Sequence, residues 1–324
     1  MTRSPLSMSS TEVRFSEAAL PSWDGVLPAW PGTMEAGTFV RRAPGAGTEP
    51  ALFVHGLGGS ATNWTDLMGL LADEVAGEAI DLPGFGHSDP PRSGSYRLNT
   101  HVKAVVRRIE ARGEGPVHLF GNSLGGAVST RVAAYRPELV RSLTLVSPAL
   151  PNLRPKRGSD PRLPLLLVPG ISQLAARQMG KRTPEQRAKS VLRLVYGDYA
   201  DVRPERLAEA VEEVRRRLTL EHAETAFTAS LRGLISAYLQ RGSLSLWRQA
   251  RSVTAPTLLI WGSKDRLVDV ALAPRAAAVF PDNRLLVLAG VGHVAQMERP
   301  ETVARAFLGM LADVAAQQAR PAAS

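Results

Sequence analysis

The chain has 324 residues, of which 44% are hydrophobic and 21% charged, a composition ordinary for a globular protein and sufficient for one large or two small domains. It contains no cysteine, which excludes disulfides, cysteine-ligated zinc, iron–sulfur clusters and a thiol nucleophile. The net charge is +9, yet the sequence has no nucleic-acid-binding motif and no basic stretch interleaved with aromatic residues. We therefore expect no nucleic-acid partner.

Residues 1–37 contain several proline and serine residues and no strand or helix pattern, and we expect them to form a leader before the fold. The first twenty residues have no apolar run of the length found in signal peptides. No window of the sequence approaches 18 uninterrupted apolar residues, so no transmembrane helix is expected. These features favour a cytoplasmic location.

Beyond the leader, short apolar runs predict strands, and most of these runs end in glycine or proline. The predicted strands are residues 38–43, 51–56, 78–84, 117–122, 140–148, 256–262 and 284–290. Segments of helical length lie between them, at 62–73, 96–112, 123–136, 267–280 and 301–317. Helices that alternate with strands apolar throughout predict an α/β fold, in which a mostly parallel, doubly wound sheet is covered on both faces.

The alternation stops between residues 150 and 250, where no strand pattern is evident. Within this segment, residues 205–218 form an amphipathic helical pattern whose apolar stripe consists of Leu207, Val211, Val214 and Leu218. Its glutamates come early and Arg215–Arg217 come late, as the helix dipole favours. We expect a helical lid at 150–250, inserted into a core of 38–149 and 251–318, with a tail at 319–324.

The lid segment is strongly basic, because residues 151–250 carry 18 Lys and Arg side chains against 10 Asp and Glu. One interpretation is a solvated, arginine-rich face. The other is attraction of acidic substrates or of an anionic membrane surface. The apolar stretch 163–170 is interpreted as lid core or pocket wall, with peripheral membrane contact as the alternative. The oligomeric state stays open.

Five short motifs stand at the ends of predicted strands, where a parallel sheet gathers its functional loops. "VHLFGNSLGGA" (117–127) contains Ser123, and the others are "HGLGG" (55–59), "DLPGFGHSD" (81–89), "WGSKDRLV" (261–268) and "GVGHVAQMERP" (290–300). A serine hydroxyl needs an adjacent base to act as a nucleophile, and His293 is the candidate. Asp265 is the candidate to orient the imidazole, with Asp269 as a competitor.

In this order and spacing the five motifs resemble the α/β-hydrolase fold superfamily, in its subgroup with a helical lid between the sixth and seventh core strands. The resemblance covers residues 38–318. It implies that Ser123 is the nucleophile, His293 the base and Asp265 the acid of a catalytic triad. It further implies an oxyanion hole made by the backbone N–H groups of Leu57 and Leu124.

Other histidines and acidic residues have simpler interpretations. His55 is expected to order the oxyanion loop and His87 to brace a turn, while Glu298 with Pro300 is expected to mark a helix start. No pair of histidines has metal-ligand spacing, so no metal is expected, and no cofactor is needed.

Three functions fit the sequence. The first is hydrolysis of a carboxylic ester of a medium-sized, largely apolar substrate through an acyl-enzyme on Ser123. The second is hydrolysis of a carbon–carbon bond in an acidic dienoate, since "GNSLGG" resembles the meta-cleavage hydrolases; Val294 departs from them, because they usually carry Trp after the histidine. The third is a receptor that uses a hydrolase pocket to bind a ligand.

Overall fold

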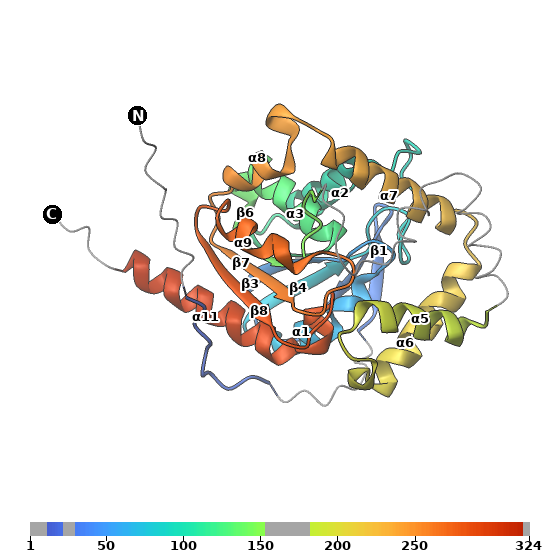
Figure 1. Ribbon diagram of the computed structural model, residues 1–324, viewed down its shortest axis with the longest axis horizontal. Coiled ribbons are helices and arrows are strands. Elements are labelled where there is room, and N and C mark those ends of the chain that lie inside the picture. Colours follow the sequence, from blue (N-terminus) through green and yellow to red (C-terminus); the bar gives the residue numbers. More distant parts are fainter. Residues whose placement is uncertain (1–11, 22–29, 153–181, 320–324) are drawn as a thin grey trace.

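An eight-stranded sheet forms the centre of the computed structural model, which describes residues 12–21, 30–152 and 182–319 (Figure 1). The strand order is β1-β2-β4-β3-β5-β6-β7-β8. β1 and β2 pair antiparallel with each other, and β2 pairs antiparallel with β4; every other pair is parallel. The strands are β1 (Gly32–Glu35), β2 (Thr38–Arg42), β3 (Glu49–Val54), β4 (Val75–Ile80), β5 (Val117–Asn122), β6 (Val140–Val146), β7 (Thr257–Gly262) and β8 (Asn283–Leu288).

The central strands are buried on both faces, which explains their nearly continuous apolar sequences. In β3, for example, Leu52 and Val54 point into one hydrophobic cluster, whereas Ala51 and Phe53 point into the cluster on the opposite face. Side chains of a strand alternate between the faces of its sheet, so both layers of helices pack against the same strands. The expected mostly parallel, doubly wound α/β fold is confirmed.

Helices cover each face of the sheet. One face carries α2 (Leu98–Arg112), α3 (Leu124–Tyr135), α8 (Leu246–Arg251) and α9 (Ala273–Ala277). The other face carries α1 (Thr65–Leu70), α10 (Ala295–Glu298) and the long α11 (Pro300–Gln318). The short 3-10 helices are η1 (Ala61–Trp64), η2 (Pro137–Leu139), η4 (Tyr199–Asp201), η5 (Gly242–Leu244) and η6 (Val270–Leu272). No helix in the described parts of the chain is both long and apolar enough to cross a membrane.

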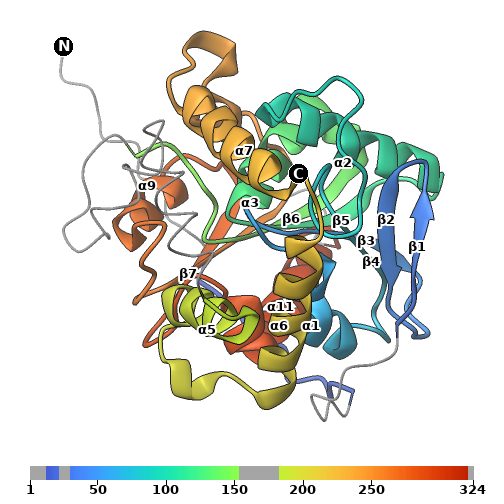
Figure 2. The same cartoon turned by 90° about the vertical axis from the view of Figure 1, so that its right-hand side faces the viewer.

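In the connection from β6 to β7, the described residues contain helices and loops but no strand. From residue 182 onward the connection contains α5 (Pro184–Val195), α6 (Pro204–Leu218) and α7 (Ala223–Tyr238) before α8. α5 and α6 lie side by side at one end of the molecule in both views, and α7 packs on α2 (Figures 1 and 2). α6 confirms the helix expected at 205–218. The stretch 163–170 lies outside the described residues.

The helix expected over 267–280 is much shorter than the sequence pattern indicated. Only Val270–Leu272 and Ala273–Ala277 are helical. The N–H groups of Leu267 and Val268 both donate to the Asp265 carboxylate instead of lying in a helix. The prediction was wrong at its start because this carboxylate holds the first residues in a turn.

Two parts of the expected leader pack on the core. β1 pairs with β2 through a turn at Ala36 and Gly37, both of which have positive φ. Residues 12–21 run beside α11, where the Arg305 guanidinium donates to the carbonyl oxygens of Ser16 and Ala18. The sequence pattern indicated neither segment, because β1 has four residues and 12–21 has no regular periodicity.

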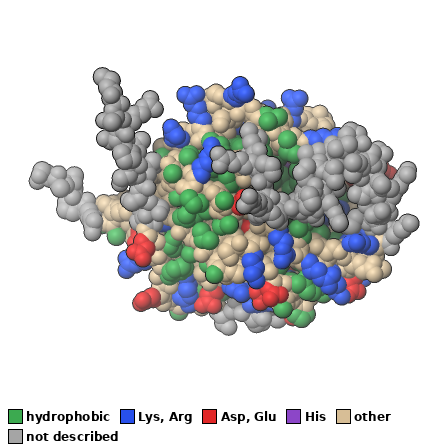
Figure 3. Space-filling model, in the orientation of Figure 1, with side chains coloured by type: hydrophobic (Ala, Val, Ile, Leu, Met, Phe, Trp, Pro, Cys, Tyr) green, Lys and Arg blue, Asp and Glu red, His purple; other side chains and the backbone are tan. Residues whose placement is uncertain are grey.

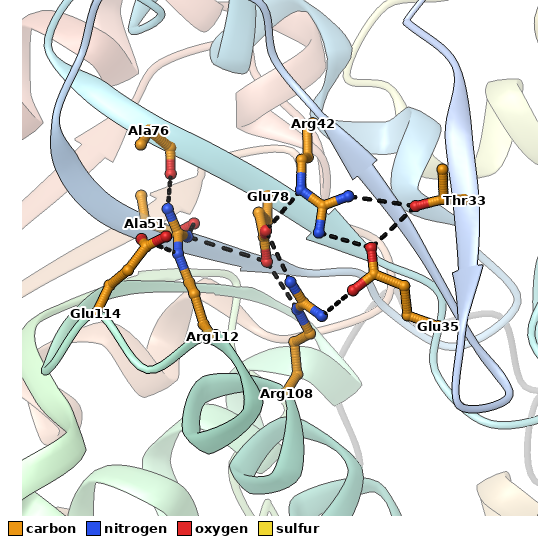
Figure 4. A network of polar contacts seen from close by, with 9 residues as sticks. All are labelled: Thr33, Glu35, Arg42, Ala51, Ala76, Glu78, Arg108, Arg112 and Glu114. Atoms are coloured by element: carbon orange, nitrogen blue, oxygen red, sulfur yellow. Dashed lines mark hydrogen bonds and ion pairs between the residues drawn. The ribbon is translucent and has the colours of Figure 1, made fainter.

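A partly buried charged network fixes the edge of the sheet that β1 forms (Figure 4). The Glu78 carboxylate on β4 accepts from Arg42 on β2 (2.9 Å) and from Arg108 on α2 (2.7 and 2.8 Å). Arg108 and Arg42 also pair with Glu35 on β1, at 2.5 and 2.6 Å. The network therefore joins α2 to three strands. Burial raises the pKa of Glu35, but hydrogen bonds from Arg42, Thr33 and Arg108 outweigh it and lower the pKa to about 2.

Candidate active site

Ser123 lies at a sharp turn between a strand and a helix. β5 ends at Asn122 and α3 begins at Leu124, while Ser123 itself has φ 54° and ψ −116°. Few residues other than glycine adopt positive φ, and such strain is concentrated at functional sites. The Ser123 N–H donates to the carbonyl of Val146 at 3.1 Å, which ties the turn to β6.

Small neighbours allow this turn to pack. A Cβ on Gly121 would come within 2.6 Å of the Gly125 carbonyl oxygen and of the Ser129 hydroxyl. A Cβ on Gly125 would come within 2.2 Å of the Val54 carbonyl oxygen on β3. These positions therefore require glycine because helix and strand approach closely, as the sequence motif indicated.

His293 and Asp265 form a buried pair at the ends of β8 and β7. His293 Nδ1 lies 2.9 Å from Asp265 Oδ2. The other oxygen of Asp265 accepts from the N–H groups of Leu267 (2.8 Å) and Val268 (2.9 Å). Burial raises the pKa of Asp265, but the charge and hydrogen bond of His293 and the two backbone donors outweigh it and hold the pKa below its ordinary value. The carboxylate is thus ionised beside the imidazole.

Asp269, the competing carboxylate in the sequence, lies elsewhere. Its Oδ1 accepts from the N–H of Ala271 at 3.0 Å and caps η6. Because Asp265 and not Asp269 is hydrogen-bonded to His293 among the described contacts, geometry favours Asp265.

The serine turn and the histidine loop are held together through Asn122. Its Nδ2 donates to the carbonyl oxygens of His293 (3.1 Å) and Val146 (3.0 Å). On the other side of the serine, a Cβ added to Gly56 would lie 2.9 Å from the Ser123 Cβ. The structure thus brings Ser123, His293, Asp265 and the "HGLGG" loop to one edge of the sheet.

The oxyanion loop is a tight turn. The Gly59 N–H donates to the Gly56 carbonyl at 3.1 Å, and Gly58 has φ +73°, as a type II turn requires at this position. This turn leaves the N–H of Leu57 without an internal acceptor. Leu124 is the first residue of α3, and its N–H is likewise without a helical acceptor. Of the two predicted oxyanion donors, Leu124 therefore follows Ser123 in the chain, and Leu57 lies in the turn that packs against Ser123.

His55 orders this loop, as expected from the sequence. Its Nδ1 donates to the Gly56 carbonyl (2.7 Å), and its Nε2 accepts from the Leu82 N–H (2.9 Å). Burial lowers the pKa of His55 to about 4, which keeps the ring neutral and able to accept. Asp81 next to it accepts from the N–H groups of Ala61 and His87, and burial raises its pKa to about 7.

Sequence reasoning missed the role of Glu298. Its two carboxylate oxygens accept from the N–H of Gly292 (2.8 Å) and from the N–H of Gly197 (2.8 Å). Gly292 precedes His293, and Gly197 follows the end of α5. The His293 N–H also donates to the Val195 carbonyl at 2.7 Å. The loop that carries the histidine is therefore bonded to the inserted helices, a contact between distant segments that no local pattern reveals.

Two arginines at the end of α6 contact two neighbouring loops, the oxyanion loop and the loop that contains Gly86. Arg217 donates to the Gly58 carbonyl at 2.6 Å, and Arg216 donates to the Gly86 carbonyl. Glu213 on the same helix pairs with both arginines. A small pocket lies between this end of α6 and the loops at Gly58 and Gly84–Gly86, and Leu220 and Phe227 are among its lining residues. The local dipole interpretation of the arginines was therefore incomplete.

A second serine–histidine contact has a different environment. His101 Nε2 on α2 lies 3.1 Å from the Ser230 hydroxyl on α7. Burial lowers the pKa of His101 to about 4, and its Nδ1 is buried without a hydrogen-bond partner. No described carboxylate orients this ring, so the contact joins two helices, whereas His293 has Asp265.

In addition to this geometry, residues 50–300 match the model of the alpha/beta hydrolase fold family. The match spans most of the chain, and the chain belongs to this family, which is a family of enzymes.

Three characterised relatives have different activities in their names. The chain is 29% identical to the dihydrolipoyllysine-residue acetyltransferase component of the acetoin cleaving system of Cupriavidus necator, over 79% of this chain and 61% of that protein. It is 27% identical to a 2-hydroxy-6-oxononadienedioate/2-hydroxy-6-oxononatrienedioate hydrolase of Cupriavidus pinatubonensis, over 83% and 87% of the two chains. It is 26% identical to human monoacylglycerol lipase ABHD6, over 81% and 75%. The chain thus spans less than two thirds of the first of these relatives.

Among solved structures, the crystal structure of Cfl2 from Burkholderia cenocepacia superposes with a TM-score of 0.73 at 21% identity, covering 88% of this chain and 97% of that one. At this identity the similarity establishes the fold alone.

Proposed function

We propose that the protein is a serine hydrolase that cleaves a carboxylic ester through an acyl-enzyme on Ser123. The observation that carries the proposal is the buried His293–Asp265 pair beside the strained turn at Ser123. Asp265 occupies Nδ1 of the imidazole, which leaves Nε2 to take the serine proton. Ser123 Oγ attacks the ester carbonyl, His293 passes the proton to the leaving alcohol, and His293 then activates water to release the acid.

The oxyanion of each tetrahedral intermediate is stabilised by two backbone donors in this proposal. Leu124 N–H stands at the start of α3, where the helix dipole favours negative charge, and Leu57 N–H projects from the turn at Gly56–Gly59. Loss of one such donor costs roughly 3 kcal/mol of transition-state stabilisation in enzymes of this kind. The bond from Arg217 to Gly58 and the ring of His55 keep this turn in place.

A medium-sized, largely apolar substrate is the class that we propose. Leu220 and Phe227 line the small pocket of about 10 Å³ beside the oxyanion loop and give this wall an apolar character. The name of the human relative, a monoacylglycerol lipase, supports an ester with an apolar acyl chain.

Hydrolysis of a carbon–carbon bond in an acidic dienoate is the second candidate. Two observations favour it: the relative from Cupriavidus pinatubonensis is named as a hydrolase of such compounds, and Arg216 and Arg217 lie beside the same pocket. Glu213 neutralises part of this charge, which favours the neutral ester as the first choice.

The test compares a p-nitrophenyl ester series of increasing chain length with a ring-fission dienoate. We expect turnover of the esters, with kcat/KM rising to a medium chain, and Ser123→Ala should lower kcat by at least about a thousandfold. Preferred turnover of the dienoate would select carbon–carbon hydrolysis. Ester turnover that survives in Ser123→Ala would refute the serine mechanism, and stoichiometric binding without turnover in either panel would select the receptor alternative.

A further inference from the structure

An open groove lies on the surface between α8, the η5 turn that precedes it, and α9. Its volume is about 690 Å³, within the range of about 300–1,000 Å³ that is usual for small-molecule sites. Arg241, Arg248, Arg251 and Arg275 line it together with Trp247, and no acidic side chain is among its described lining residues. None of the three candidate catalytic residues lies in its wall, so the groove is separate from the proposed active site.

The four arginines of this groove have no ion pair with any described residue. The arginines at the end of α6 differ, because Glu212 pairs with Arg215, and Glu213 pairs with Arg216 and Arg217. Figure 3 shows Lys and Arg side chains gathered over α8 and the segment before it, without acidic side chains among them. Among the described residues, the arginines at the end of α6 therefore have glutamate partners, whereas the arginines of the groove have none.

The walls of the groove are held by buried contacts. α8 packs on the core through Leu246 and Ala250, both of which are fully buried. The Trp247 indole donates to the Pro151 carbonyl at 3.0 Å, and the Arg275 guanidinium lies 4.1 Å from the centre of the Trp247 ring. Arg248 and Arg251 are three residues apart on α8 and therefore project from the same side of the helix. The groove thus keeps several cationic groups close together on fixed elements.

Concentrated like charge disfavours the folded state unless a counter-charge is present, so a groove of this kind is suited to bind an anion. A guanidinium presents a planar set of donors that matches the oxygens of phosphate in pairs. We propose that the groove between α8 and α9 binds a phosphate-bearing anion. Its source is either a soluble phosphorylated compound or the headgroup of an acidic phospholipid, and the two share the same recognition chemistry.

The test uses two triple variants of the full chain. The groove variant combines Arg248→Gln, Arg251→Gln and Arg275→Gln. The control variant combines Arg107→Gln, Arg215→Gln and Arg232→Gln, which removes the same charge from exposed positions outside the groove. Thermal melting followed by circular dichroism verifies that both fold; if the triple groove variant does not fold, the single variants Arg248→Gln and Arg251→Gln replace it.

Binding is measured by calorimetry with inorganic pyrophosphate, and by co-sedimentation with vesicles of phosphatidylcholine alone or with added phosphatidylglycerol. We expect saturable binding that weakens with salt, is reduced at least about tenfold in the groove variant, and is retained in the control variant. Binding of pyrophosphate supports a soluble ligand, and binding confined to phosphatidylglycerol vesicles supports a headgroup. Equal losses in the two variants, or no binding to either probe, would overturn the proposal.

Discussion

The hydrogen bond to His293 distinguishes Asp265 from Asp269, which lies four residues later in the sequence. Asp265 contacts His293 and accepts two backbone N–H groups, whereas Asp269 caps η6. The physical difference is that only Asp265 lies at the carboxyl end of β7, where the turn aims its side chain at the neighbouring strand end. Its role as the orienting acid is a prediction that mutation can test.

The first prediction uses Asp269 as the matched control. Asp265→Asn should lower kcat for a p-nitrophenyl ester by at least about a thousandfold, because the imidazole loses both its orientation and the charge that stabilises its protonated form. Asp269→Asn should keep kcat within about twofold, since an asparagine side chain can also cap η6. Steady-state kinetics on the two purified variants measures the effect. Equal effects of the two substitutions would contradict the assignment.

The second prediction concerns Glu298, whose carboxylate bonds the loop that carries His293. Glu298→Gln replaces an acceptor with an amide that presents N–H to one of two backbone N–H groups, so one hydrogen bond is lost next to His293. We expect kcat to fall about tenfold with KM nearly unchanged, because a lost buried hydrogen bond costs about 1 kcal/mol or more. Glu301→Gln is the control, since Glu301 is exposed and Arg305 is its one ion-pair partner among the described residues. A Glu298→Gln variant with lower stability but normal kcat would show a structural role alone.

At the scale of the elements, the edge of the sheet depends on charge more than on apolar packing. β1 has no buried residue and pairs with β2 alone. Its Glu35 carboxylate reaches across to Arg108 on α2 and to Arg42 on β2 (Figure 4). This explains why a strand of four residues is held at the edge although its sequence predicts no strand.

Because the pKa of Glu35 is lowered in the folded protein, the contribution of its ion pairs to stability can be tested by varying the pH. The pKa is lowered from 4.5 to about 2 in the folded protein, so the ion pairs stabilise fully above about pH 4.5 and are lost as the pH falls towards 2. Glu35→Gln should therefore reduce the free energy of unfolding at neutral pH, and the difference from the natural protein should shrink as the pH is lowered below 4.5. Urea unfolding of both proteins at several pH values measures this difference in the free energy of unfolding. A difference that is constant with pH would contradict the ion-pair account.

At the scale of the whole molecule, two segments far apart in the sequence, residues 12–21 and α11, lie side by side. Residues 12–21 lie along α11, where Gly309 leaves room for the backbone of Arg14: a Cβ at Gly309 would come within 1.9 Å of the Arg14 carbonyl oxygen. The long-range bonds of Arg305 to Ser16 and Ala18 complete the contact. The expected leader thus takes part in covering α11.

Gly309→Leu should displace this segment. We expect faster cleavage of residues 12–21 by added protease and faster amide exchange there, while ester turnover changes little because Gly309 lies halfway along α11, whereas His293 lies in the loop before α10. Ala312→Leu, at an exposed position of α11, is the control and should leave both rates unchanged. Limited proteolysis followed by mass spectrometry provides the measurement. Unchanged protection of the segment in Gly309→Leu would refute the contact.

The sequence by itself determined the elements whose signals are local. Apolar runs indicated the parallel strands, and motifs at strand ends indicated Ser123, Asp265 and His293, because parallel strands place their carboxyl ends at one edge. The glycines around Ser123 were predictable for a related reason, since a turn between strand and helix has no room for side chains.

Only the tertiary structure decided the features that depend on distant segments meeting. The bonds of Glu298 have no local signal, because they join Gly197, which follows α5, to Gly292, which precedes His293. The arginines were visible in the sequence, but the sequence did not show that those of α6 pair with glutamates while those of the groove pair with no acidic residue that the structure describes. Net charge depends on composition, whereas neutralisation depends on which side chains the fold places within reach of one another.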